Sequence, residues 1–91
     1  MAYPGKDGLL IRRIQRAGLG KVRAAALRQG TRPEQWHEDV KVLRAVANSS
    51  PASAAQKCGI GRGAVWYRLT KYARIAESIL ETTKERTDAH D

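Results

Sequence analysis

The chain has 91 residues, a single cysteine and no phenylalanine, and its 17 lysine and arginine residues against 9 acidic residues give a net charge of +8. This length allows one small domain with a core of Leu, Ile, Val and Ala side chains, and the lone Cys58 excludes both a disulfide framework and a cysteine-rich zinc site. The strong positive charge favours a polyanionic partner such as nucleic acid.

The first third of the chain is predicted to be basic and helical. Residues 1–8 combine proline and glycine with no apolar period, which predicts a flexible start. Residues 9–30 have apolar residues at helical spacing, which predicts a short amphipathic helix over 9–17 and, after two interrupting glycines, a second helix capped by Gly30. The basic residues of these helices include weaker candidates for phosphate contacts, namely Arg12, Arg13, Arg16, Lys21 and Arg23.

A third helix is expected from residue 33 onward. Thr31 can cap its N-terminus, Pro33 suits an early helical position, and Glu34 lies near the positive end of the helix dipole. Apolar residues at spacings of four and three predict its buried face, namely Trp36, Val40, Leu43 and Ala47. We expect this helix to support the following segment from behind.

The middle of the chain is predicted to form two helices joined by a tight turn. Ser50 can cap the first helix and Pro51 fits its first turn, so this helix is expected to end near Cys58. Gly59 then supplies a left-handed turn residue without steric cost. These features predict a helix-turn-helix within a core that spans residues 33–72.

The second helix of this pair is predicted to be long. Val65 and Leu69, four residues apart, are expected to form its buried ridge. The apolar spacing continues beyond Tyr72, so residues 73–86 are predicted to extend the same helix and to form a seam with the N-terminal helices or with a second copy of the chain. Residues 87–91 are predicted to be an acidic, frayed tail.

The run from Ser53 to Tyr72 resembles the Fis-type helix-turn-helix of the bacterial nucleoid protein Fis and of the C-terminal DNA-binding domains of enhancer-binding activators. The resemblance is carried by small, turn and buried positions, namely Ala54, Ala55, Gly59, Ile60, Arg62, Gly63, Val65, Leu69, Lys71 and Tyr72. In that family the second helix enters the major groove. The resemblance therefore implies that residues from Arg62 to Lys71 bind DNA.

The start of the second helix carries the main candidates for DNA contacts. Arg62 and Gly63 lie where backbone N–H groups and the positive end of the helix dipole can meet an anion. An arginine also matches guanine with two parallel hydrogen bonds. Thr70 and Lys71, about two turns further on, are expected to contact the phosphate backbone. Weaker candidates of the same kind lie on this helix, namely Arg68 and Arg74.

Two adjacent aromatic residues, Trp66 and Tyr67, stand among these candidates. A helix cannot bury both on one narrow stripe, so we expect one of them to face outward. An outward ring could pack on thymine methyl groups or on the edge of a sugar. Alternatively, Trp66 could anchor the core against the N-terminal helices.

No catalytic or metal-binding pattern is found in the sequence. His37 and His90 lie far apart, with no cysteine or carboxylate pattern of a metal site around them. The run Gly59–Gly63 is similar to a phosphate loop only superficially, because no predicted strand precedes it and no Gly-Lys-Ser/Thr ending follows. We therefore expect no enzymatic activity and no cofactor.

The sequence as a whole predicts an all-α fold of about five helices with a central helix-turn-helix and an extended C-terminal recognition helix. Its longest strongly apolar run, residues 9–11, is too short to span a membrane, and we expect a cytoplasmic, nucleoid-associated protein. The leading hypothesis is a bacterial or phage transcriptional regulator that binds specific double-stranded DNA as a homodimer. The alternatives are a DNA-recognition and assembly subunit such as a phage small terminase, and an adaptor that recruits RNA polymerase.

Overall fold

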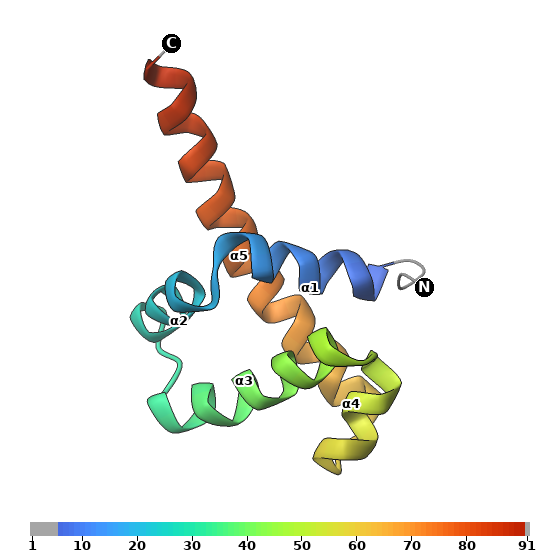
Figure 1. The fold of residues 1–91 in the computed structure, drawn as a ribbon. Coiled ribbons are helices and arrows are strands. Elements are labelled where there is room, and N and C mark those ends of the chain that lie inside the picture. Colours follow the sequence, from blue (N-terminus) through green and yellow to red (C-terminus); the bar gives the residue numbers. More distant parts are fainter. Residues whose placement is uncertain (1–5, 91) are drawn as a thin grey trace.

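The computed structural model describes the backbone of residues 6–90 and the side chains of residues 8–82. Within this part the chain forms five α-helices and no strand, which confirms the predicted all-α fold (Figure 1). The helices are α1 (Lys6–Ala17), α2 (Leu19–Arg28), α3 (Pro33–Asn48), α4 (Pro51–Cys58) and α5 (Arg62–His90).

The longest helix, α5, is the element on which the other four pack. It contacts α1, α2, α3 and α4. Figure 1 shows α3 and α4 beside its N-terminal half and α1 crossing its middle, while its C-terminal end projects beyond the bundle. The two turns at its N-terminus therefore lie at one end of the molecule, next to α4.

The core contains the apolar faces that the sequence predicted for α3 and α5. Trp36, Val40 and Leu43 are buried on α3, and Val65 and Leu69 are buried on α5. Ala47, the fourth predicted position on α3, is only half-buried. Further buried side chains come from α1, α2 and α5, among them Ile11, Ile14, Val22, Tyr72 and Ala76.

Two glycines end helices as their positions predicted. Gly30 follows α2 with a φ of 104°, and the next residue, Thr31, donates its N–H to Ala26 O at 3.0 Å. Gly59 follows α4 with a φ of 67°, and the next residue donates its N–H to Ala55 O at 3.0 Å. Both ends thus have the six-to-one bond of a Schellman motif, in which the left-handed residue lets the chain turn back over the helix end.

The predicted cap of α4 is confirmed, whereas that of α3 is wrong. Ser50 Oγ accepts a hydrogen bond from Ser53 N–H at 3.1 Å, and Pro51 occupies the first turn of α4. At α3 the cap position belongs to Arg32, which makes no side-chain cap bond. The reason is that Pro33 occupies the first helical position of α3, which makes Arg32 rather than Thr31 the cap residue.

Three helix boundaries differ from those expected. Gly20 lies inside α2, because Gly18, with a φ of 95°, already makes the break between the first two helices. The first helix begins at Lys6, so residues 6–8 of the predicted flexible start are helical, and residues 1–5 lie outside the described part. At the other end α5 reaches His90. Polar terminal turns need no buried partner, so apolar spacing does not mark them.

Candidate nucleic-acid interface

The connection between α4 and α5 brings the N-terminus of α5 to the surface. The left-handed Gly59 turns the chain at the end of α4, and α5 begins three residues later at Arg62. Ala54 and Ala55 on α4 and Val65 on α5 are buried beneath this connection. The small side chains of α4 allow the two helices to approach closely. One side of the start of α5 therefore packs on α4, and the opposite side is exposed to solvent.

The first two turns of α5 expose the side chains that the sequence placed at a DNA contact. Arg62 and Gly63 are both exposed. Trp66 retains 44% of its surface and Tyr67 retains 64%. Both adjacent aromatics therefore face outward, and the tryptophan that anchors the core is Trp36, whose ring packs edge-on against Tyr72 with centroids 5.4 Å apart.

Further along α5, some of the residues predicted to contact the DNA phosphate backbone are exposed and others are half-buried. Arg74 is exposed, whereas Thr70 and Lys71 are half-buried. The Lys71 ammonium lies 5.1 Å from the centroid of the Tyr72 ring, a cation–π contact. The Thr70 hydroxyl is buried and has no hydrogen-bond partner among the described residues. With Gly63 and Tyr67, Thr70 and Arg74 follow helical spacing along one side of α5.

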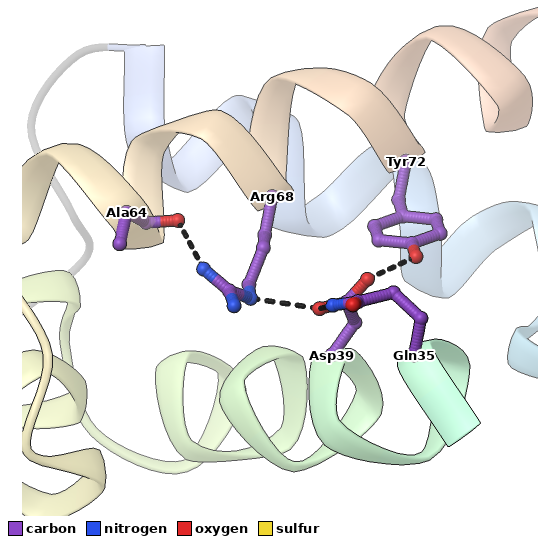
Figure 2. A network of polar contacts seen from close by, with 5 residues as sticks. All are labelled: Gln35, Asp39, Ala64, Arg68 and Tyr72. Atoms are coloured by element: carbon purple, nitrogen blue, oxygen red, sulfur yellow. Dashed lines mark hydrogen bonds and ion pairs between the residues drawn. The ribbon is translucent and has the colours of Figure 1, made fainter. Parts of the chain in front are cut away.

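Arg68, predicted as a weaker DNA contact, turns inward instead. Its Nε donates to Asp39 Oδ1 at 2.8 Å, and its Nη1 donates to Ala64 O at 3.0 Å (Figure 2). Its side chain is 21% exposed, so the guanidinium lies at the edge of the core. Arg68 therefore joins α5 to α3, and we remove it from the candidate DNA contacts.

Asp39 is the buried centre of this network and was not among the residues predicted from the sequence. It is 2% exposed and accepts three hydrogen bonds, one from Arg68, one from the Tyr72 hydroxyl and one from Gln35 Nε2 at 2.8 Å (Figure 2). A buried carboxylate of this kind requires such partners. Its position could have indicated burial, because Asp39 lies beside Val40 and three residues after Trp36, on the apolar face of α3.

The Tyr72 phenol is held in its neutral form by this environment. Burial, together with the hydrogen bond to Asp39 and its negative charge, raises the pKa of Tyr72 above its usual range. Nearby Arg68 and a hydrogen bond from Thr31 act on the pKa in the opposite direction but are outweighed. In the unfolded chain the phenol ionises near pH 10, so folding favours the protonated form above that pH.

We expect stability to fall at alkaline pH because of Tyr72. The contribution of its neutral phenol is complete below about pH 10 and is lost as the pH rises from there towards the higher pKa of the folded state, by up to about 1.4 kcal/mol for each pH unit. Urea unfolding between pH 9 and pH 11 measures this, with Tyr72→Phe and the exposed Tyr67→Phe compared. Only Tyr72→Phe should reduce the fall in the free energy of unfolding between pH 9 and pH 11. An equal dependence on pH in both variants would show that Tyr72 is not its cause.

The five basic candidates of the N-terminal helices are all exposed. They are Arg12, Arg13, Arg16, Lys21 and Arg23. Arg13 Nη1 lies 3.7 Å from Glu77 Oε2 on α5, a surface ion pair that partly compensates its charge. Lys21 borders a hollow between α2 and α5.

The distribution of charge around α4 and the first half of α5 is one-sided. From residue 40 to residue 76 the sequence contains no aspartate or glutamate. The same stretch contains seven basic residues, namely Lys41, Arg44, Lys57, Arg62, Arg68, Lys71 and Arg74. Arg68 pairs with Asp39 and Lys41 pairs with Glu38 at 3.8 Å, and the remaining five cations give this region a positive potential that attracts polyanions.

Metal and membrane sites find no support in the described part of the chain. Within it, no three His, Cys, Asp or Glu side chains come close enough to hold a metal ion. No helix there combines the length and the apolar character needed to cross a membrane. His37 is exposed, Cys58 is half-buried at the end of α4, and the side chain of His90 lies outside the described residues.

The chain matches no protein-family model, and comparison with curated proteins and with solved structures also gives no match. The functional interpretation therefore depends on the residues of the site and their geometry.

Proposed function

We propose that this protein binds double-stranded DNA by placing the first turns of α5 in the major groove, with α4 and α5 acting as a helix-turn-helix, and that it regulates transcription in a bacterium or phage. The observation that carries the proposal is the joint exposure of Arg62, Trp66 and Tyr67 at the supported N-terminal end of α5. The absence of acidic residues from position 40 to position 76 leaves this end electropositive.

The chemistry of these side chains fits the edges of base pairs. The Arg62 guanidinium can donate two parallel hydrogen bonds to the O6 and N7 atoms of guanine. Trp66 and Tyr67 offer large apolar surfaces, which suit the methyl groups of thymine and would be costly to leave in water without a partner. Exposed Gly63 has no side chain, so the backbone of the first turn can approach the DNA closely.

The length and direction of α5 also support this arrangement. The segment from Arg62 to Arg74 spans about 18 Å, and the major groove, about 12 Å wide, admits a single helix. Thr70 and Arg74 lie further along the same side and can contact phosphates when the first turns lie in the groove. We propose that two copies bind as a homodimer, since a two-fold protein can contact two half-sites.

An assembly role is the second candidate, and the projection of α5 beyond the bundle favours it (Figure 1). A free helix end can pack between subunits, so the same DNA-binding unit could belong to a ring such as that of a phage small terminase. Light scattering of the protein in solution separates the two, because the regulator is expected to be a dimer and the packaging subunit a larger ring.

A fluorescence anisotropy titration tests the DNA-binding proposal. The ligands are a duplex that the protein selects from a random pool and a scrambled duplex of equal length. Arg62→Ala is expected to lose about 1–3 kcal/mol on the selected duplex, a roughly 5- to 150-fold weaker binding, because a bidentate contact to a base is removed.

Arg44→Ala is the matched control, since it removes the same charge from an exposed position on α3. Its loss should be small and equal on both duplexes. Unchanged binding of Arg62→Ala to the selected duplex would remove α5 from the proposed interface.

A further inference from the structure

A shallow groove runs between α2 and α5 and begins beside the exposed N-terminal turns of α5. It consists of three adjoining hollows of about 420, 580 and 350 Å³, all bordered by Gln29 at the end of α2. Along α5 the groove extends from Tyr67 to Thr82. Fifteen helical steps of 1.5 Å make it about 22 Å long. We call it the α2–α5 groove.

The side chains around the α2–α5 groove are strongly basic. Five cationic residues border it, namely Lys21, Arg28, Arg32, Lys71 and Arg74. Among the described side chains no carboxylate borders it, and none of the five cations forms an ion pair with a described residue. Cations on both walls repel one another across the groove until an anion lies between them.

The shape of the groove favours a linear anion over a compact one. The lining of the groove includes the apolar residues Ala25, Ile75 and Ile79, and the groove is shallow. A single small anion would therefore not be enclosed by polar groups. One strand of duplex DNA carries a regular row of phosphates, so a groove about 22 Å long can contact several of them in succession.

We propose that the α2–α5 groove binds the phosphate backbone of DNA next to the segment that α5 reads. The groove begins at Tyr67, which also belongs to the exposed N-terminal turns of α5, so one duplex can contact both surfaces. The inference takes the identity of its ligand from the proposed function. It assigns Arg28 and Arg32, from α2 and the loop after it, to phosphate binding beside Lys71 and Arg74.

The test is the salt dependence of binding, measured by anisotropy on the selected and the scrambled duplex. The groove variant Arg28→Ala/Arg74→Ala changes two exposed side chains, and its matched control, Lys41→Ala/Arg44→Ala, removes the same charge from exposed positions on α3. The groove variant is expected to bind both duplexes more weakly by the same factor. The slope of log affinity against log salt should become shallower by about two, because each lost phosphate contact removes about 0.9.

Two results would overturn the groove inference. One is a salt slope that changes no more in the groove variant than in the α3 control. The other is an unchanged slope together with loss of self-association in light scattering, which would assign the groove to the acidic C-terminal end of a second copy. Arg62→Ala, measured in parallel, separates the two proposals. A shallower slope in the groove variant with no effect of Arg62→Ala on the selected duplex would retain the groove as a backbone site and reject the base-reading role of α5.

Discussion

Asp39→Ala is expected to lower the free energy of unfolding by about 3–5 kcal/mol, because it removes one member of a buried ion pair and leaves the other uncompensated. Without the carboxylate, the Arg68 guanidinium and the Tyr72 hydroxyl both lose an acceptor at the contact between α3 and α5. A domain of this size has a total stability of about 5–15 kcal/mol, so the loss is a large part of it.

Urea unfolding followed by circular dichroism measures this effect. Glu38→Ala is the matched control, since it removes the adjacent carboxylate, which is exposed and pairs with exposed Lys41 at 3.8 Å. Surface pairs of this kind contribute about 0–1 kcal/mol. A loss for Asp39→Ala no greater than that for Glu38→Ala would show that the network does not hold α5 on α3.

Raising the salt concentration from about 50 to about 200 mM is expected to weaken DNA binding by roughly 500-fold. The α2–α5 groove presents five cations to the phosphates, namely Lys21, Arg28, Arg32, Lys71 and Arg74, whereas Arg62 is assigned to a base edge. If each of the five neutralises one phosphate, the slope of log affinity against log salt is about −4.5, since each contact contributes about −0.9.

A titration series at several salt concentrations gives this slope directly. A single strand of the same length serves as a comparison, because each phosphate contact there contributes only about −0.7. A slope between zero and −1 on the duplex would mean that at most one phosphate is neutralised, which contradicts an extended basic interface.

Local signals in the sequence were sufficient for most of the fold. Ser50 and Pro51 marked the start of α4, and Gly59 marked its end, because caps and left-handed residues act on their immediate neighbours. The buried ridge of Val65 and Leu69 also followed from spacing alone. The helical ends were less predictable, since exposed terminal turns carry no apolar pattern.

The features that were missed depend on contacts between residues distant in sequence. Arg68 was expected to be a surface residue because its spacing does not reveal a partner 29 residues away on α3. Asp39 was missed for the same reason. The α2–α5 groove likewise forms only when α2 packs on α5, so the sequence placed Arg28 and Arg74 on separate helices with no sign that they border one surface.

The central claim is that the first turns of α5 touch the DNA, and acrylamide quenching of tryptophan fluorescence tests it most directly. The two tryptophans differ in access, because Trp36 is 6% exposed and Trp66 is 44% exposed, so quenching of the free protein reports mainly on Trp66. Adding the selected duplex is expected to protect Trp66 from quenching, with a midpoint equal to that of the anisotropy titration, and Trp66→Phe should abolish this change. If anisotropy saturates while the quenching of Trp66 stays the same, the DNA binds elsewhere and the claim is contradicted.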